Sequence, residues 1–348
     1  MEFTMRTRPS MDKAWYQPSH TFALIYMVYG LSLFGLPAYG SFYVSTFDWA
    51  LWQKIITMVP LTILAGYGLN MMGFIGHEGT HGSLLKNRKS SAITGIFFAS
   101  AVLTYFEMGF AMSHWNHHRY TNQDDDPDIQ PVSKLKTWWQ RILFTRFIYN
   151  ALYFKYTWLM ATGQPNPLKY KMAYPIKDQI LFARLNFLFS GLWLALYIGI
   201  ALVSWKAALF CVVLPSLTVK VIGACQIYID HAGLDDRFLG NAYSRTSPLM
   251  TILFFGANYH LEHHAYPGIP CYRLPKVHKR LIELGVYEVA NPPIVKGFFE
   301  SFKAMNKKYE VGMAGSDFDA FTPAFDEQKI ATRQTEAAPT IKEEATPA

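Results

Sequence analysis

The sequence predicts an all-α integral membrane protein with four transmembrane helices in two hairpins, accompanied by interfacial helices and a cytoplasmic helical cap. Composition is the first observation, because 51% of the 348 residues are hydrophobic and only 16% are charged. Soluble domains usually contain about 25% charged residues. The second observation is a set of four long apolar stretches, each close to the roughly 20 residues that a helix needs to cross a bilayer.

The four apolar stretches occur as two neighbouring pairs. They cover residues 21–43, 51–75, 181–204 and 207–229. A short turn near residues 45–50 separates the first two stretches, and only Trp205 and Lys206 separate the last two. Helices joined by so short a connection run antiparallel. The pattern therefore predicts two helical hairpins.

Lysine and arginine residues gather at one end of these hairpins. Such residues accumulate in the cytoplasmic segments of membrane proteins. The basic residues that flank the hairpins on this side are Arg6, Arg8, Lys13, Lys86, Arg88, Lys89 and several between Lys134 and Lys177. We therefore expect a multi-pass protein with both termini and the central segment in the cytoplasm. The net charge of +7 suits a membrane surface, and we expect no nucleic-acid partner.

This organisation divides the chain into three regions. Residues 1–20 form a cytoplasmic N-terminal segment, residues 21–285 the membrane domain, and residues 286–348 a cytoplasmic C-terminal region. The tail after about residue 312 is rich in proline, threonine, alanine and glutamate and lacks periodicity. Such a composition predicts disorder.

A fifth apolar run, residues 91–110, needs a separate interpretation. If it crossed the bilayer, the motifs HEGTH at 77–81 and HWNHH at 114–118 would lie on opposite faces of the membrane. The run contains Glu107 and several glycines, which favour an interfacial or re-entrant segment.

Eight of the 11 histidines fall into three short groups, HEGTH, HWNHH and HLEHH. Residues three or four apart share one face of a helix, so each group directs its imidazoles the same way. All three groups lie at cytoplasmic ends of apolar runs, and neutral imidazole is the commonest metal ligand. The pattern predicts a metal site formed by His77, His81, His114, His117, His118, His260, His263 and His264, with His231 in reach. His20 and His278 are interpreted as structural.

Eight or nine imidazoles exceed the coordination of one ion, so the pattern predicts two metals. Zinc prefers four ligands and closed sites, whereas histidine-rich sites with open positions suit iron. Nearby carboxylates are expected to accept hydrogen bonds from imidazole N–H groups. These carboxylates are Glu78, Asp124, Asp125, Asp126, Asp128, Asp230 and Glu262. A solvated loop or a helix cap is the alternative interpretation of the four aspartates at 124–128.

The three groups resemble the histidine boxes of the membrane-bound fatty-acid desaturase and hydroxylase superfamily. The resemblance covers residues 20–285 and is closest in NYHLEHHAYPGIPCYRLPKVH and in the aspartate run after the second group, both similar to bacterial desaturase-like members. In that superfamily the boxes bind two irons that activate dioxygen. The resemblance therefore implies a cytoplasmic di-iron centre with O2 as co-substrate, with the eight box histidines as ligands and His231 as a less regular one.

The implied activity is that of a fatty-acyl desaturase, which introduces a double bond into an acyl chain. A hydroxylase, ketolase or oxidative decarboxylase of a lipid or carotenoid stays open, because the boxes do not separate these reactions. The acyl chain can be carried on lipid, coenzyme A or a carrier protein. Three cysteines (Cys211, Cys225 and Cys271) are too few for an iron–sulfur cluster, and no dinucleotide-binding fingerprint is present. A separate ferredoxin-type or cytochrome-type electron donor with a reductase is implied.

Further residues are candidates for substrate and membrane contacts. Trp138 and Trp139 are interpreted as an interfacial anchor, and the basic segment 275–280 as a contact for an anionic lipid, carrier or electron donor. A membrane metal transporter or zinc hydrolase is the alternative of a different class, but Arg184 and Lys220, the main ionisable residues in the spans, do not ligate cations. Aromatic side chains near the boxes are candidates for a substrate tunnel or for plain packing; they are Tyr105, Phe106, Trp115, Phe254, Phe255 and Tyr259.

Overall fold

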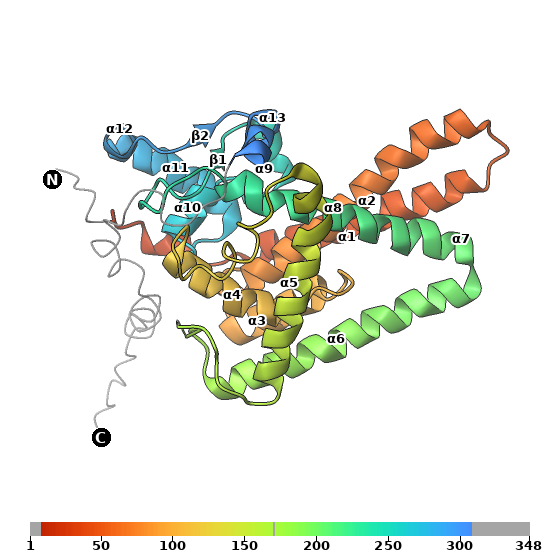
Figure 1. The fold of residues 1–348 in the computed structure, drawn as a ribbon, viewed down its shortest axis with the longest axis horizontal. Helices are drawn as coiled ribbons and strands as arrows, with labels where there is room; N and C mark the ends of the chain where they lie inside the picture. The colour runs from red at the N-terminus through yellow and green to blue at the C-terminus, as the bar shows by residue number, and fades with distance from the viewer. Residues whose placement is uncertain (1–7, 170, 308–348) are drawn as a thin grey trace, which may run out of the picture.

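The computed structural model describes residues 8–169 and 171–307, which form a mostly helical protein (Figure 1). The four predicted spans are confirmed as helices long and apolar enough to cross a membrane. They are α1 (His20–Ser45), α2 (Leu51–His81), α6 (Ile176–Val203) and a continuous stretch from Trp205 to His231. The predicted disordered tail after about residue 312 lies outside the described residues.

The fourth span changes its helical form along its length. It comprises α7 (Trp205–Ala208), a π-helical turn (Leu209–Val213) and α8 (Leu214–His231). Pro215 near the start of α8 lacks an amide hydrogen, so the chain cannot continue a regular hydrogen-bond pattern through this point. His231 is the last residue of the span.

Helix α2 is longer than predicted, since it continues past residue 75 to His81. Its 31 residues correspond to about 46 Å, which exceeds the roughly 30 Å of the hydrocarbon core. The first half carries exposed apolar side chains such as Leu51, Ile56 and Ile63, whereas the second half is largely buried from Ala65 onward. The first histidine group therefore lies on the end of the same helix that forms the span.

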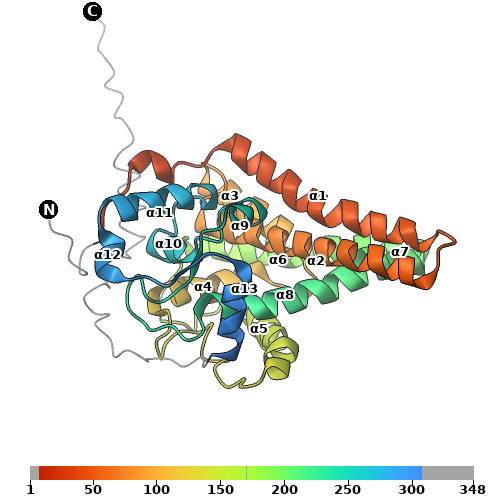
Figure 2. The same ribbon diagram turned by 90° about the horizontal axis from the view of Figure 1, so that it is seen from above.

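The two pairs of spans are packed differently. Helices α1 and α2 lie side by side (Figures 1 and 2), and a Cβ at Gly68 would lie only 2.2 Å from the backbone nitrogen of Phe34. Such a close approach requires glycine. Helices α6 and α8 instead diverge from their junction at Ser204 (Figure 1). Helix α8 packs on α2, and α6 packs on α3 and α5, so the two helices of the second pair share a short connection but pack mainly on other helices.

The apolar run 91–110 is not one element. It is divided between α3 (Arg88–Ala99) and α4 (Glu107–Tyr120). The connection is held by Asn186 of α6, whose amide accepts a hydrogen bond from the Met108 backbone N–H and donates one to Ser100. The run thus consists of two helices joined by a turn, and its interfacial or re-entrant position stays a prediction.

The remaining elements form the body around the histidines. Helix α5 lies across the spans in Figure 1, and the C-terminal elements cover the opposite end from the loop between α1 and α2. Two two-residue strands, β1 and β2, pair in parallel. These elements are η1 (Lys13–Tyr16), α5 (Trp138–Ala161), β1 (Ser244–Arg245), α9 (Pro248–Leu253), α10 (His260–Ala265), η3 (Cys271–Arg273), α11 (Leu274–Glu283), α12 (Val286–Ala290), β2 (Ile294–Val295), α13 (Phe298–Phe302) and η4 (Lys303–Asn306).

Candidate metal centre

The first histidine group occupies the last turns of α2. His77 and His81 lie one turn apart and share a face of the helix. Helix α2 ends at Gly82, whose φ of 73° is the left-handed conformation typical of a helix C-cap. Gly79 lies so close to α3 that a Cβ there would be 2.6 Å from the Cα of Gly95. The end of α2 is thus held by close packing against α3.

The other histidines come from three separate segments. His114, His117 and His118 lie on the C-terminal half of α4, and His231 is the last residue of α8. The third group lies on α10, a six-residue helix. A short helix with this many polar residues depends on its surroundings for stability.

The structure gathers all nine predicted histidines into two adjacent groups. In the five-histidine group (His77, His81, His114, His118 and His263), one ring nitrogen from each residue lies within 4.8 Å of the others. In the second group, His117, His231 and His264 meet the same criterion. The Nε2 atom of His260 lies 3.0 Å from His231 Nε2 and 3.1 Å from His264 Nε2, so His260 completes a four-histidine group.

The nitrogens in both groups converge in a way that hydrogen bonding alone does not explain. His114 Nε2 lies 3.0 Å from His77 Nε2 and 2.9 Å from His118 Nε2. His231 Nε2 likewise lies 3.2 Å from His117 Nε2 and 3.0 Å from His260 Nε2. A ring nitrogen offers either one N–H or one lone pair, so it cannot pair with two neighbours at once. A common ion that accepts several of these lone pairs would fit this geometry.

His81 provides an independent test of the fit to a metal. Its side chain is buried, and neither ring nitrogen has a hydrogen-bond partner within the part of the chain that the structure describes. An unsatisfied buried polar group costs about 1–3 kcal/mol. A metal ion in the five-histidine group would supply the missing partner, so the residues present fit a metal.

Burial keeps the imidazoles of α4 and α10 neutral, which is the form that binds metals. Burial lowers the pKa of His117 to about 4, against a smaller opposing effect of Asp128. Burial and neighbouring histidines also hold the pKa values of His114, His118 and His263 well below the usual range. The same two causes lower the pKa of His264.

Hydrogen bonds fix the tautomers of three histidines in the four-histidine group. His117 Nδ1 donates to Asp126 at 2.8 Å, and His231 Nδ1 donates to the backbone carbonyl of Asn241 at 2.8 Å. Thr121 uses its hydroxyl hydrogen for the carbonyl of His117, so His264 Nδ1 must donate to Thr121 Oγ1 at 3.2 Å. Each Nε2 then carries a lone pair directed into the group. No pattern in the sequence predicts that Thr121 and Asn241 accept these hydrogen bonds.

Asp126 is held in place by the loop that follows α4. Its carboxylate accepts hydrogen bonds from the backbone N–H groups of Asn122 and Asp128, both at 2.9 Å. Asn122 adopts a positive φ of 62°, which asparagine tolerates better than most residues. The side-chain amide of Asn122 donates to the carbonyls of Asp235 and Asn241, which links this loop to the segment that supports His231.

Other predicted carboxylates lie farther from the rings. Asp128 Oδ2 is 3.7 Å from His114 Nδ1, and Glu78 Oε1 is 3.8 Å from His77 Nδ1. Asp230 lies 4.0 Å from His260 Nε2. These separations exceed hydrogen-bond length, so the carboxylates act on the rings through charge alone.

Glu78 and Glu262 play a different part from the one expected. Glu78 accepts hydrogen bonds from the Ser83 hydroxyl and the Cys271 backbone N–H, each at 3.0 Å. Glu262 accepts from Ser244, Tyr287 and His278. The expectation that Glu262 accepts from a box imidazole is corrected, because its carboxylate holds α10 against α11. His278 lies in this buried contact, in agreement with its interpretation as structural.

Asp124 and Asp125 do not lie among the histidines. Both are exposed, and Asp125 forms an ion pair with Lys169. Their chain segment turns outward because the backbone N–H groups on either side of Asp126 fold inward around its carboxylate. The expected contact of these two aspartates with imidazoles is therefore corrected to a solvated loop.

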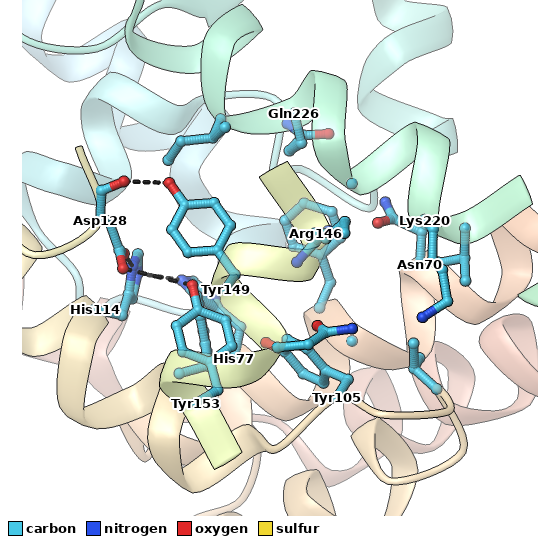
Figure 3. A pocket seen from close by; sticks show the side chains of 18 of the residues that line it. Asn70, His77, Tyr105, His114, Asp128, Arg146, Tyr149, Tyr153, Lys220 and Gln226 are labelled. Carbon is cyan, nitrogen blue, oxygen red and sulfur yellow. Dashed lines mark hydrogen bonds and ion pairs between the residues drawn. The ribbon is translucent and has the colours of Figure 1, made fainter. Parts of the chain in front are cut away.

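A cavity of about 140 Å³ adjoins both histidine groups (Figure 3). His77, His114, His117, His231 and His260 contribute to its wall. Of the six aromatic candidates for a tunnel or for plain packing, Tyr105 lines the cavity, whereas Phe106, Trp115, Phe254, Phe255 and Tyr259 are absent from its lining. These side chains serve packing instead: Phe255, for example, stacks on Tyr26. The aromatic lining comes from Phe74, Tyr105, Phe110, Tyr149 and Tyr153.

Comparison with known proteins places these observations in context. Residues 54–294 match the family model described as fatty acid desaturase. The chain is 27% identical over 260 residues to dihydrorhizobitoxine desaturase of Bradyrhizobium elkanii, an alignment that covers 67% of this chain and 70% of that protein.

Two further relatives have names that indicate different activities. A beta-carotene ketolase of Paracoccus sp. is 26% identical over 240 residues, covering 65% of this chain and 83% of the ketolase. The human sphingolipid delta(4)-desaturase is 25% identical over 208 residues, covering 58% of this chain and 59% of that enzyme. The relatives thus share a class of oxidative chemistry but not one substrate.

Proposed function

The chain belongs to the fatty acid desaturase family, a family of oxidoreductases, and we propose that it is an O2-dependent membrane desaturase that introduces a double bond into an acyl chain. The observation that carries the proposal is the convergence of nine imidazoles into two adjacent groups beside a cavity. Similarity to two proteins named desaturases supports it.

Two irons are the metals that we assign to these residues. The five-histidine group would hold one iron and the four-histidine group the other, because each offers at least the ligands that an iron needs while leaving positions open. Bound iron supplies the oxygen chemistry needed to remove hydrogen from an alkyl carbon, which no side-chain acid or base can do.

The protein's own side chains prepare this site for the reaction. Asp126, Thr121 and Asn241 keep the protons of their partner imidazoles on Nδ1. Phe74 and Phe110 present apolar surface beside His77 and His114, where they exclude water from the reacting end of the cavity. The cavity orients the chain so that one carbon faces the histidines.

We propose that the histidine groups lie at the cytoplasmic side of the membrane. The basic segments before α1 and after α2 support this orientation. Helix α5 is then an interfacial helix, because it lies across the spans and exposes Trp139, Phe147 and Trp158 along one side. The exposed Trp139 fits its predicted role as an interfacial anchor.

Electrons are proposed to come from a separate ferredoxin-type or cytochrome-type protein with its reductase. The chain has three cysteines, fewer than the four that an iron–sulfur cluster requires, and all three are free. The segment from Lys276 to Arg280 exposes positive charge that an acidic donor can contact.

A ketolase is the second candidate, favoured by the similarity to the beta-carotene ketolase. It would use the same histidines and the same metals. Product analysis separates the two activities, because a desaturase yields a new double bond whereas a ketolase adds a carbonyl oxygen.

One experiment tests the metals and the reaction together. Protein purified from iron-replete cells should contain about two irons per chain, since nine imidazoles exceed the coordination of one ion. Lipid extracts of a host that expresses the protein should contain oxygen-dependent unsaturated products that are missing from a His117→Ala strain. One metal per chain would refute the two-site assignment, and zinc with full turnover would refute the iron assignment.

A further inference from the structure

The cavity has a second polar end, away from the histidines. Asn70 of α2, Arg146 of α5 and Lys220 of α8 line it together with the apolar residues between them. Figure 3 shows Lys220 and Asn70 on one side of the pocket and His77 and His114 on the other. The proposed reaction requires the histidine end, but it assigns no role to this cationic end.

Lys220 and Arg146 are the two cations at this end of the cavity. Lys220 Nζ donates to the hydroxyl of Thr104 at 2.9 Å, and the Arg146 guanidinium lies 6.0 Å from the ring centre of Tyr105. Within residues 8–169 and 171–307, neither forms an ion pair with a carboxylate. Two neighbouring positive charges that are partly removed from water repel each other unless an anion joins them.

Asn70 is a second, independent sign of a ligand. Its side chain is 9% exposed, and its Nδ2 has no hydrogen-bond partner among the described residues. Such a donor is costly to bury without an acceptor. A ligand with anionic oxygens would satisfy Asn70 and both cations at once.

Helix α8 makes room for the guanidinium. A Cβ at Gly223 would lie 1.8 Å from Nη2 of Arg146, so this position of the arginine requires a residue without a side chain. Replacement of Gly223 by alanine would therefore displace Arg146 without removing its charge. This gives a means of testing placement separately from charge.

We propose that this end of the cavity binds an anionic group, a carboxylate or a phosphate, at one end of the substrate. The inference rests on the proposed function, because it takes the cavity as the substrate site. Asn70 and His77 are seven residues apart on α2, so their backbone positions are separated by about 10 Å along the helix axis. The position oxidised is then counted from the anionic end of the chain.

The size of the cavity agrees with such a substrate. A volume of about 140 Å³ resembles that of an engineered protein cavity of about 150 Å³ that binds benzene. The cavity therefore has room for the part of a chain between its anionic end and the reacting carbon. A long chain would have to continue outside it.

Binding of three probes to the iron-loaded full chain in lipid nanodiscs tests the proposal. Dodecanoate and dodecyl phosphate carry the two candidate anionic groups. Methyl dodecanoate, which has the same acyl chain but no charge, is the control. We expect at least one anion to bind about 10-fold or more tightly than the ester, since charge-assisted hydrogen bonds are about twice as strong as neutral ones. The anion with the higher affinity shows whether the site prefers a carboxylate or a phosphate.

Variants locate the preference in the structure. Arg146→Gln, Lys220→Gln and Gly223→Ala should each reduce the preference for the anion several-fold, whereas binding of the ester should stay unchanged. Arg184→Gln is the matched control, because Arg184 on α6 donates to the carbonyl of Ala161 and does not line the cavity. Iron content and folded yield are measured for every variant.

The outcomes distinguish this inference from the proposed function. Equal affinity for ester and anions, or a preference that survives in Arg146→Gln, Lys220→Gln and Gly223→Ala together, would overturn the anionic subsite even if the ester is desaturated. A preference lost in these variants would support the subsite. If that preference were found but no probe were oxidised in an oxygen- and donor-dependent way, the proposed function would fail and the subsite would remain.

Discussion

The five-histidine group and the four-histidine group both gather imidazole nitrogens but differ in the contacts that hold the rings. In the four-histidine group, His117, His231 and His264 each donate a hydrogen bond from Nδ1, at 2.8–3.2 Å. In the five-histidine group, the carboxylates nearest His77 and His114 lie at 3.8 and 3.7 Å, and His81 has no hydrogen-bond partner within the described chain. One group is fixed by hydrogen bonds, whereas the other has more ligands.

The difference points to two ways of preparing a position for the proposed metals. Hydrogen bonds from Nδ1, the ring nitrogen that faces away from the group, fix the tautomer and the ring orientation before a metal binds. Extra ligands compensate for weaker orientation, because the ion still finds enough imidazoles when one ring moves. We therefore expect the four-histidine group to be sensitive to single changes in its surroundings and the five-histidine group to be more tolerant.

Removal of a ligand from the smaller group should have the largest effect. His117→Ala should abolish turnover and lower the iron content from about two to about one per chain, because three histidines remain in its group. Metal analysis and donor-dependent product formation measure the two effects. His20→Ala, an exposed residue at the start of α1, is the control and should match the wild type. Retention of both irons and activity by His117→Ala would show that this group is not a metal site.

A change in the hydrogen bond to His117 should have the next largest effect. In Asp126→Asn the amide can still accept the imidazole N–H but carries no charge, so turnover should fall by about 10–100-fold. Steady-state rates at saturating donor measure the loss. Asp124→Asn, an exposed residue in the same loop, should leave the rate unchanged. Equal rates for the two variants would mean that Asp126 does not tune the metal.

The corresponding change in the five-histidine group should matter less. Asp128→Asn removes a charge 3.7 Å from His114 Nδ1, a distance too long for a hydrogen bond. Turnover should fall by less than about 10-fold, below the range expected when a hydrogen-bonded outer partner is lost. The rate ratio between Asp128→Asn and Asp126→Asn tests the comparison directly. A larger loss in Asp128→Asn would reverse the ranking of the two groups.

The smallest effect on turnover is expected for a residue that supports the helix shared by both groups. His278→Ala removes one of three donors to the buried Glu262, which lies on the same short helix as His260, His263 and His264. The free energy of unfolding should fall by about 1–3 kcal/mol while both irons are retained. Thermal unfolding is compared with Lys279→Ala, an exposed neighbour. Loss of iron from only one group in His278→Ala would contradict a shared structural role.

Local patterns were sufficient to predict the spans and the histidines that the structure brings together. Length and hydropathy identify a span because the bilayer imposes a minimum run of apolar residues. Spacing of three or four residues identifies HEGTH, HWNHH and HLEHH, since it places imidazoles on one face of a helix. The carboxylates were less predictable: Asp126 reaches His117, but Asp124 and Asp125, its immediate neighbours, face solvent. Proximity in sequence does not specify side-chain direction in a loop.

The sequence by itself thus determined the membrane helices and the nine histidines, and the tertiary structure decided how those histidines are divided. HWNHH is split between the groups, because successive residues of a helix are rotated by about 100°, which separates His117 from His118. The partners that complete each group are distant in the chain: His263 meets His118, and His231 meets His117. The cationic end of the cavity likewise combines residues from α2, α5 and α8. Contacts between helices that are far apart in sequence depend on packing, which no local pattern encodes.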